Sequence, residues 1–189
     1  MVRVARNIPK HAKLAFRGQT VSVYQWRQKM FDGSYETFEA IKRAYTVQMI
    51  PVVGDKVAIV HEEQPGVGSW WGLVGGRMDE GEKPAHAARR ELLEETGLVP
   101  KKLKLLRTFN VPHSQVDWNV YLFLANGCRK VAEQDLDAGE KITVHYVTLD
   151  KLLNLNGRLG PDIALYFNEI RNDGKRLQAF KKELFGSGD

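Results

Sequence analysis

The sequence predicts a layered domain of the α/β or α+β class, in which a β-sheet lies between helices and follows an N-terminal β-hairpin. Two observations predict it: extended, apolar segments make up most of the chain, and helical segments interrupt them at two places. A third is the length, since 189 residues can bury one hydrophobic core and leave a short extension. We expect the extension to cover residues 1–43 and the main domain to cover residues 44–189.

The expected hairpin lies in the extension. Residues Thr20–Lys29 mix β-branched and aromatic side chains with polar ones, and Tyr35–Phe38 resumes this extended character. The Asp32–Ser34 segment between them supplies residue types that favour a turn. The two segments are therefore predicted to pair as an antiparallel hairpin.

Two apolar, β-branched segments open the main domain. Thr46–Val53 and Lys56–His61 are joined by Gly54-Asp55, a dipeptide suited to a tight hairpin turn. Pro51 cannot donate a hydrogen bond within a sheet, so we expect it at an edge or a bulge. Further strands are predicted at Trp71–Val74, Leu103–Phe109, Asn119–Ala125 and Ile142–Val147.

The best marked helix is predicted over Pro84–Thr96. Proline suits the first turn of a helix, and Gly97 stands where a left-handed C-terminal cap is wanted. Ala85, Ala88 and Leu92 recur at the spacing of one helix face, which predicts that this face packs on the sheet. Three more helical segments are predicted nearer the C-terminus, at Leu152–Leu155, Asp162–Arg171 and Leu177–Phe185.

Composition indicates a soluble globular protein. Apolar residues make up 43% of the chain and charged residues 27%, and no apolar stretch approaches the ~20 residues of a membrane span. The basic N-terminus has no apolar segment after it that would make a secretory signal, so we expect a cytoplasmic protein. Cys128 is the single cysteine, which excludes an intramolecular disulfide and disfavours a zinc site built on cysteine.

The net charge of +5 leaves three interpretations open: solubility, steering of an anionic substrate, or affinity for nucleic acid. Two clusters of basic residues carry part of this charge, within Lys101–Lys104 and Lys175–Lys182. Neither cluster interleaves aromatic residues in the way of a surface that binds single strands. The sequence therefore disfavours nucleic acid as a partner.

Three carboxylates crowd one part of the predicted helix. Glu91 and Glu95 are four residues apart and Glu94 lies beside them, so the three repel one another. Arg90 offsets only part of this repulsion, and a divalent cation would offset the rest; oxygen ligands favour Mg²⁺ or Mn²⁺ over zinc. The Gly75–Gly76 pair lets the backbone turn sharply and approach such an ion or a phosphate. The alternative is an ordinary solvated helix with a charged face.

The segment from Gly76 to Leu98 resembles the Nudix box. The matching residues are Gly76, Glu82, Arg90, Glu91, Leu92, Glu94, Glu95, Gly97 and Leu98. The resemblance implies the fold of the Nudix hydrolase family, an α/β/α sandwich around a mixed sheet, here preceded by the N-terminal hairpin. It also implies metal-dependent cleavage of a nucleoside diphosphate linked to a second group.

The resemblance also implies roles for individual residues. By position, the metal ligands would be Glu91, Glu95 and the Gly75 carbonyl. Glu94 would be a nearby ligand or a supporting group, and Glu82 and Arg90 would orient the catalytic glutamates through hydrogen bonds.

Many members of the family take one more base or metal ligand from a loop well after the box. Here the acidic segment Leu136–Ile142 leads into a predicted strand, and Glu140 is the preferred candidate for both roles. Asp137 and Glu133 are the next candidates for these roles. The alternative for Glu140 is an ordinary solvated loop residue.

Among Nudix subfamilies the chain most resembles the ADP-ribose pyrophosphatases. The resemblance rests on Phe31–Ser34, Gly76–Glu82 and Tyr121–Ala125, and Pro112 follows the box at nearly the usual spacing of the subfamily. It implies hydrolysis of ADP-ribose to AMP and ribose 5-phosphate. Other sugar nucleotides, dinucleoside polyphosphates and NADH stay open as substrates, and so does a non-catalytic role in sensing nucleotides or binding nucleic acid.

Two predictions concern the rest of the substrate. Gln64–Trp70 is compact where many ADP-ribose enzymes carry a longer connection with an arginine, so we expect Arg77 to bind the phosphates instead. Adenine recognition would need an aromatic platform. The candidates by type are Trp26, Phe31, Trp70 and Trp71. We assign Trp26 to the substrate, although in related enzymes the hairpin packs across a dimer, where Tyr24, Trp26 and Phe31 would equally fit the interface. The resemblance accordingly predicts a homodimer.

Overall fold

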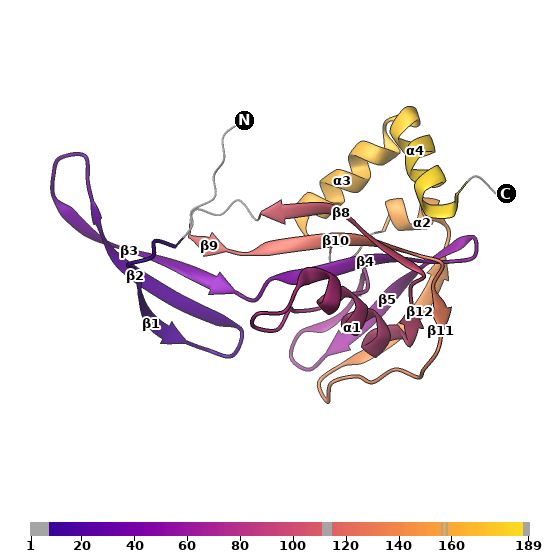
Figure 1. The fold of residues 1–189 in the computed structure, drawn as a ribbon, viewed down its shortest axis with the longest axis horizontal. Coiled ribbons are helices and arrows are strands. Elements are labelled where there is room, and N and C mark those ends of the chain that lie inside the picture. The colour runs from indigo at the N-terminus through magenta and orange to yellow at the C-terminus, as the bar shows by residue number, and fades with distance from the viewer. Residues whose placement is uncertain (1–7, 111–114, 156, 158, 187–189) are drawn as a thin grey trace.

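Residues 8–110, 115–155, 157 and 159–186 are described by the structure, a computed structural model of the chain (Figure 1). The main elements are a large sheet, a smaller N-terminal sheet and helices that cover the large sheet. Pro112, whose spacing from the box supports the resemblance, lies outside the described residues.

The large sheet runs in the order β12-β5-β4-β10-β8, and β6 pairs with β5 beside this path. Its strands are β4 (Thr46–Val53), β5 (Lys56–Gln64), β6 (Gly68–Gly72), β8 (Lys102–Asn110), β10 (Asn119–Asn126) and β12 (Lys141–Val147). β10 and β4 pair in parallel and the other neighbours pair antiparallel, so the sheet is mixed, as expected. The short strands β7 (Leu98–Val99) and β11 (Arg129–Lys130) pair with each other.

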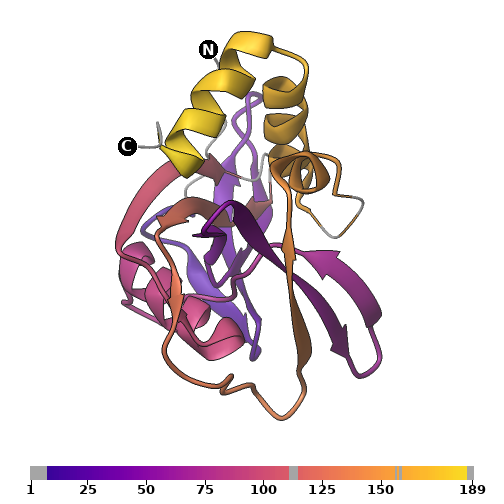
Figure 2. The same cartoon turned by 90° about the vertical axis from the view of Figure 1, so that its right-hand side faces the viewer.

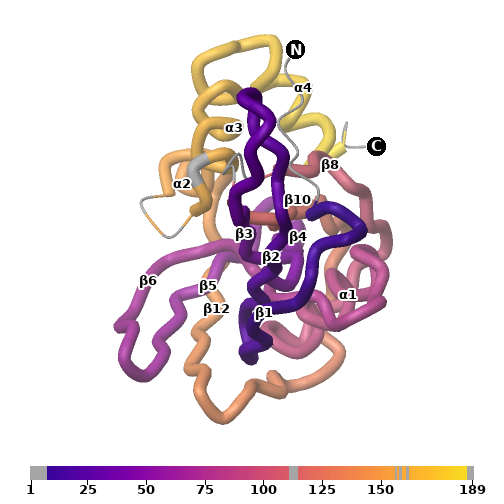
Figure 3. The backbone as a smooth tube through the Cα atoms, turned by 90° about the vertical axis from the view of Figure 1, so that its left-hand side faces the viewer, coloured from indigo at the N-terminus to yellow at the C-terminus, as the bar shows by residue number. Residues whose placement is uncertain are grey.

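The N-terminal extension forms the smaller sheet, in the order β1-β2-β3-β9. Its strands are β1 (Lys13–Arg17), β2 (Val21–Lys29), β3 (Tyr35–Arg43) and β9 (Val116–Asp117). The β2–β3 hairpin confirms the predicted one, and it projects to one side of the large sheet (Figures 1 and 3). Because β9 comes from a later part of the chain, a domain boundary after residue 43 stays a prediction.

Helices cover both faces of the large sheet (Figure 2). They are α1 (Pro84–Thr96), α2 (Leu149–Leu153), α3 (Pro161–Arg171) and α4 (Gly174–Phe185). α1 packs on one face, where Met49, Val60 and Leu92 share a buried core. The other three helices cover the opposite face, whose core includes Leu122 and Phe167. The α/β/α sandwich implied by the resemblance is therefore confirmed.

Within the described residues, no helix has both the length and the apolar character needed to cross a membrane.

Pro51 lies in the central strand β4, so the expectation of an edge or a bulge is wrong. The N–H of Met49, two residues earlier, donates to Val74 at 2.8 Å, on the side of β4 that faces away from β10. The nitrogen of Pro51 points to the same side, just before the pairing of β4 with β5 begins at Val52. The missing N–H therefore breaks no bond between β4 and β10.

Several elements begin earlier than the sequence predicts. β6 covers Gly68–Gly72 rather than Trp71–Val74, because a turn at residues 65–67 already joins β5 to β6, and glycine is a poor indicator of a strand. α2 and α4 each begin three residues early, at Leu149 and Gly174. The side chains of Thr148 and Asp173, respectively, cap these two helices at their N-termini.

Candidate active site

Helix α1 positions the carboxylates that the sequence singles out. Ala88 and Leu92 are buried against the sheet, as predicted, but Ala85 is exposed and Ala87 is buried instead. The buried face is therefore rotated relative to the predicted one, and it includes Glu95, of which only 5% is exposed. A carboxylate so deeply buried needs a partner that stabilises its charge.

The glycine loop that precedes α1 lies against two of the carboxylates. The N–H of Gly75 donates to Oε2 of Glu95 at 2.8 Å, and Gly75 adopts φ 146°, a conformation that favours glycine. A Cβ atom on Gly76 would lie 2.4 Å from Oε2 of Glu91, so the lack of a side chain leaves room for this carboxylate. The loop is held to β4 by a 3.0 Å hydrogen bond from the N–H of Val47 to the Gly76 carbonyl.

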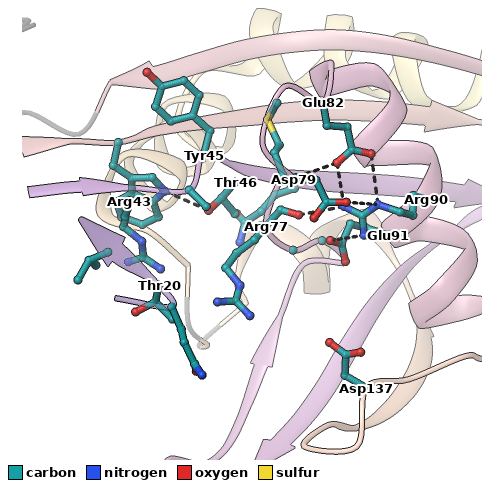
Figure 4. Close-up of a pocket in the computed structure, with 18 of the residues that line it drawn as sticks. Thr20, Arg43, Tyr45, Thr46, Arg77, Asp79, Glu82, Arg90, Glu91 and Asp137 are labelled. Atoms are coloured by element: carbon teal, nitrogen blue, oxygen red, sulfur yellow. Dashed lines mark hydrogen bonds and ion pairs between the residues drawn. The ribbon is translucent and has the colours of Figure 1, made fainter. Parts of the chain in front are cut away.

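Arg90 joins three glutamates and the glycine loop (Figure 4). Its Nη1 donates to Glu91 and Glu94, both at 2.9 Å. Its Nε and Nη2 donate to the two oxygens of Glu82 at 3.2 and 3.0 Å, and Nη2 also donates to the carbonyl of Arg77 at 3.0 Å. The hydrogen bonds to Glu82 are the main reason that the pKa of Arg90 is raised, and the guanidinium stays charged.

The carboxyl groups of the site have raised pKa values. Burial raises the pKa of Glu91 to about 7, against the lowering effect of Arg90. Burial also raises the pKa of Glu95, and the negative charges of Glu91, Glu62 and Glu140 raise it further. The pKa of Glu140 is raised too, again mainly by burial. These groups disfavour one another's charged forms, an effect that a nearby cation would reverse.

The residues fit a divalent cation by their chemistry, since every side-chain donor is a carboxylate oxygen, the ligand type that hard cations prefer. In the described part of the chain, no three acidic, histidine or cysteine side chains already converge as a complete ligand set. Glu91 faces Arg90, and Glu95 faces the N–H of Gly75. An ion that binds here would therefore compete with Arg90 and Gly75 for the carboxylate oxygens.

A cleft of about 1500 Å³ opens over the carboxylates. From α1 it is lined by Glu91, Glu94 and Glu95, and from the loop before β12 by Asp137 and Glu140. More than forty residues of sequence separate these two groups, and the fold brings them to one place. The later loop therefore places acidic side chains in the same cleft as the carboxylates of α1.

The third candidate from the later loop lies elsewhere. Glu133 is exposed, it pairs with Lys130 at 3.0 Å, and it does not line the cleft. Asp137 and Glu140 remain as candidates, and the N–H of Glu140 donates to the carbonyl of Asp137 at 2.9 Å, which closes the turn that carries both.

Of the predicted substrate residues, Arg77 lines the cleft and Trp26 does not. Arg77 extends its guanidinium into the open part of the site (Figure 4). Trp26 is 8% exposed within the N-terminal sheet, where its Nε1 donates to Gln28 at 3.2 Å and its ring meets Phe38 edge-on. A role for Trp26 in substrate binding has no geometric support within one chain.

The other three aromatic candidates occupy different places in the structure. Trp70 lines the cleft. Trp71 points to the opposite face of β6, where its ring centre lies 4.9 Å from that of His61 and 4.7 Å from that of His145. Phe31 is fully exposed at the turn between β2 and β3. Trp70 is therefore the one of the four candidates that lies beside the carboxylates.

Several lining residues were not foreseen. Glu62 and Gln64 lie on β5 and line the cleft, and Gln64 donates to Glu62 at 2.6 Å. Side chains alternate between the two faces of a strand, so these two residues lie on the same face of β5 as Ala58 and Val60, which are buried under α1. Gln48 is a polar residue in the apolar strand β4, and its Oε1 is buried without a hydrogen-bond partner among the described residues.

Arg43 and Trp118 line the cleft on the side of the N-terminal sheet. The Nε1 of Trp118 donates to the hydroxyl of Thr46 at 3.0 Å, across 72 residues of sequence. No local pattern predicts a contact of this length, because it depends on how β9 and β10 return to β3 and β4.

Comparison with known proteins agrees with this architecture. The chain is 29% identical over 143 residues to the ADP-ribose pyrophosphatase of Bacillus subtilis (strain 168), a match that covers 74% of this chain and 77% of that protein. It is 26% identical over 141 residues to the methanol dehydrogenase activator of Bacillus methanolicus, covering 73% of this chain and 76% of that protein.

Among solved structures, the fold is similar to that of an ADP compounds hydrolase, with a TM-score of 0.63 and 20% sequence identity over 92% of this chain and 90% of that one. At this level of identity the likeness shows the fold alone. The NUDIX domain family matches residues 42–166, which is well over half of the chain. With the complete box between Gly76 and Leu98, this chain belongs to the Nudix family.

Proposed function

We propose that this Nudix protein hydrolyses the diphosphate linkage of ADP-ribose and releases AMP and ribose 5-phosphate. Membership of the Nudix family supports the general reaction, and the similarity to an ADP-ribose pyrophosphatase over three quarters of both proteins supports the substrate. The observation that carries the proposal is the meeting of Glu91 and Glu95 from α1 with Glu140 from the later loop in one cleft.

The oxygen-rich site would hold Mg²⁺ or Mn²⁺. Its ligands would be Glu91, Glu95, Glu140 and the Gly75 carbonyl, with Glu94 beside them. When bound, a divalent ion neutralises charge on phosphate oxygens and lowers the pKa of a bound water. Glu91 and Glu95 lose their repulsion in its presence, which favours their charged forms.

The side chains of the protein have separate tasks in the proposed reaction. Arg77 binds the diphosphate, for which its cleft position and its planar guanidinium are suited. Glu140 accepts a proton from the attacking water, since it lines the cleft together with Glu91 and Glu95 and its carboxylate has two oxygens. The water oxygen bonds to one phosphorus, and the bond from that phosphorus to the bridging oxygen breaks. The bridging oxygen leaves with the other phosphate.

Arg90 and Glu82 are positioning residues. Arg90 reaches Glu91 and Glu94 through one nitrogen while Glu82 accepts from the other two, so the guanidinium has a fixed anchor. Glu82 in turn accepts the N–H of Asp79 at 3.0 Å, which connects the anchor to the glycine loop. Each contact limits the movement of the catalytic glutamates.

Trp70 is the candidate aromatic platform for a nucleobase among the four tryptophan and phenylalanine residues that the sequence singled out. It lies on β6 beside the carboxylates and lines the cleft. A tryptophan ring stacks on a flat base and provides large contact area. A Trp70→Ala variant should raise the KM for ADP-ribose more than it lowers kcat.

The experiment that tests the function is incubation of the purified protein with ADP-ribose and Mg²⁺, followed by separation of the products. We expect AMP and ribose 5-phosphate in equal amounts. Parallel reactions with other sugar nucleotides, dinucleoside polyphosphates and 5′-triphosphorylated RNA rank the substrates by kcat/KM. Tight nucleotide binding without turnover of any of these compounds would refute the enzyme hypothesis and favour a role in sensing nucleotides.

We also propose that the chain pairs with a second copy through its N-terminal sheet, as the resemblance to the ADP-ribose pyrophosphatases implies. The sheet exposes large apolar side chains, with Phe16 58% exposed, Tyr35 51% exposed and Ile41 39% exposed. β1 is an edge strand whose residues are all exposed, and an uncovered edge of this kind favours association with another chain.

A further inference from the structure

The later loop, residues 131–140 between β11 and β12, is attached to the C-terminal end of α1. The N–H of Val131 donates to the carbonyl of Gly97 at 2.9 Å, and the N–H of Asp135 donates to the carbonyl of Glu94 at 2.9 Å. Carbonyl groups at the C-terminal end of a helix lack partners within the helix, so a neighbouring segment can donate to them. The loop therefore runs along the end of the helix that carries the carboxylates.

After Asp135 the chain leaves α1 and forms an arm, residues 136–140, before it returns as β12. Leu136, at the start of the arm, packs against the core beneath α1. Asp137 and Glu140 line the cleft, and Asp137 lies across the open site from Glu91 (Figure 4). The hydrogen bond from the N–H of Glu140 to the carbonyl of Asp137 lies within the arm. The position of Glu140 relative to α1 therefore depends on contacts at the ends of the arm.

The side chain of Gln134 joins both ends of the arm to α1. Its Nε2 donates to the carbonyl of Glu95 at 2.5 Å and to the carbonyl of Ile142 at 3.1 Å. An amide nitrogen of this kind has two N–H groups, and these two carbonyls use both. Gln134 thus connects Glu95, one proposed metal ligand, to a point two residues after Glu140, another proposed ligand.

The surroundings of Gln134 separate this contact from core packing. The residue is exposed, so it adds little to the hydrophobic core. Its two hydrogen bonds go to main-chain groups of two different elements, α1 and β12. Their main effect is therefore on the distance between these elements, and on the arm that lies between them.

We propose that Gln134 is a positioning residue for the reaction: it holds the arm against α1, so that Glu140 meets Glu91 and Glu95 in the cleft. This inference rests on the proposed function, because it takes these three glutamates as the reacting site. Without the two hydrogen bonds the arm moves away from α1, and Glu140 no longer completes the site. The site would then bind a divalent ion less tightly.

Gln134→Met keeps the length of the side chain and removes both donors. With ADP-ribose we expect kcat to fall about tenfold and the half-saturating Mg²⁺ concentration to rise about tenfold, the effect of losing a group that orients a metal ligand. KM for ADP-ribose should stay within about twofold of the wild type, because Arg77 and Trp70 lie outside the loop. Gln178→Met is the matched control. Gln178 is exposed on α4 outside the cleft, so this variant should behave as the wild type.

A measurement without turnover separates this inference from the proposed function. Hydrogen exchange in metal-free buffer, followed by mass spectrometry, should be about fivefold faster in residues 134–142 of Gln134→Met than of the wild type, and unchanged in α3 and α4. Gln178→Met should show the exchange of the wild type in residues 134–142. If the wild type hydrolyses no diphosphate, the proposed function fails, and this comparison alone decides whether Gln134 holds the arm.

Equal exchange of residues 134–142 in the wild type and Gln134→Met would overturn the proposal. Faster exchange in an active protein whose kcat and Mg²⁺ dependence are unchanged would also overturn it, and so would faster exchange throughout the protein, which indicates general loss of stability. If Gln134→Met shows no thermal unfolding transition, Gln134→Asn tests the same contact, because its amide is one methylene too short to reach both carbonyls.

Discussion

At the scale of single residues, Arg90 and a cation would compete for the same carboxylate oxygens. Arg90 donates to Glu91 and Glu94, and both groups line the cleft. Its two hydrogen bonds to Glu82 would persist when Glu91 turns to an ion, because Glu82 is not one of the expected ligands. Arg90 can therefore release one carboxylate without losing its own position.

Replacement of either main carboxylate should abolish most of the activity. Glu91→Gln and Glu95→Gln each remove a charged oxygen ligand, and we expect kcat for ADP-ribose to fall by about a hundredfold or more. Mg²⁺ should raise the melting temperature of the wild type and have little effect on either variant, since a ligand stabilises only the state that binds it.

The matched control for these variants is Glu36→Gln, an exposed glutamate on β3 outside the cleft. It should leave both kcat and the Mg²⁺ effect on the melting temperature unchanged. Unchanged activity in Glu91→Gln and Glu95→Gln would refute the assignment of these residues as ligands.

The pKa of Glu91 makes stability depend on pH when no divalent ion is present. Its ordinary value is 4.5 and burial raises it to about 7, so between these values the folded protein holds a proton that the unfolded chain has released. The stability from this group is present below pH 4.5 and is lost as the pH rises through about 7. Over this range, the free energy of unfolding should fall by roughly 3 kcal/mol more in the wild type than in Glu91→Gln.

Urea unfolding at pH values below, within and above this range measures the difference, with a chelator present. Repeating the series with Mg²⁺ should reverse the trend, since the ion favours the charged form of Glu91. A pH dependence that is the same in wild type and Glu91→Gln would contradict the raised pKa.

At the scale of elements, the glycine loop and α1 act as one unit. A Cβ atom on Gly75 would lie 2.1 Å from the carbonyl oxygen of Val47, and its φ of 146° is unfavourable for any other residue. Gly75→Ala should lower the free energy of unfolding by about 2 kcal/mol or more. Gly76→Ala should displace the Glu91 carboxylate, 2.4 Å from the added atom, and lower kcat more than stability.

The control for both glycine variants is Gly139→Ala, because nothing lies within 4 Å of the position that its Cβ would take. It should change the free energy of unfolding by less than about 0.5 kcal/mol. Urea unfolding and a turnover assay on the three variants separate the two effects. Gly75→Ala with the stability of the wild type would show that the approach of the loop to β4 is looser than described.

Local patterns predicted the elements whose contacts lie close in sequence. Helix α1, the β2–β3 hairpin and the Gly54 turn between β4 and β5 were predicted because their signals fall within a few residues. The rotation of α1 that buries Glu95 was not, since the position of the sheet beneath the helix selects the buried face. The alternation of apolar residues in β5 would have pointed to Glu62, but alternation alone does not tell which face meets the cleft.

Contacts between residues that are far apart in the sequence determine which other residues line the site. Glu140 and Glu133 are both acidic residues of the loop before β12, and only the path of that loop brings Glu140 into the cleft and leaves Glu133 beside Lys130. Trp26 and Trp70 are the same residue type, and their burial and position separate them. The sequence carries no local signal for either difference.

At the scale of the whole molecule, the cleft belongs to both sheets. The large sheet and α1 supply the acidic residues, and the N-terminal sheet supplies residues that line the other end of the cleft. The chain carries a net charge of +5, although the centre of the site is acidic. A positive molecule attracts an anionic substrate from a distance, and the cation in the site would remove the local repulsion.

Pairing of two copies through the N-terminal sheet should be visible in solution. We expect light scattering after size-exclusion chromatography to give twice the chain mass of 21.5 kDa, that is, a dimer. The double variant Phe16→Ser, Ile41→Ser should shift the protein toward the monomer, because it removes exposed apolar area from one face of the sheet. Leu105→Ser, at a 46% exposed position of β8, is the matched control and should stay dimeric. A monomeric wild type would refute the dimer.

The most direct test of the central claim is the release of AMP from ADP-ribose, followed by mass spectrometry in ¹⁸O-labelled water. Wild type with Mg²⁺ should release AMP and ribose 5-phosphate, with one ¹⁸O in one of the two products. Addition of a chelator, or the Glu91→Gln substitution, should stop the release. Equal release by wild type and Glu91→Gln, or no release with either Mg²⁺ or Mn²⁺, would contradict a metal-dependent hydrolase built on Glu91, Glu95 and Glu140.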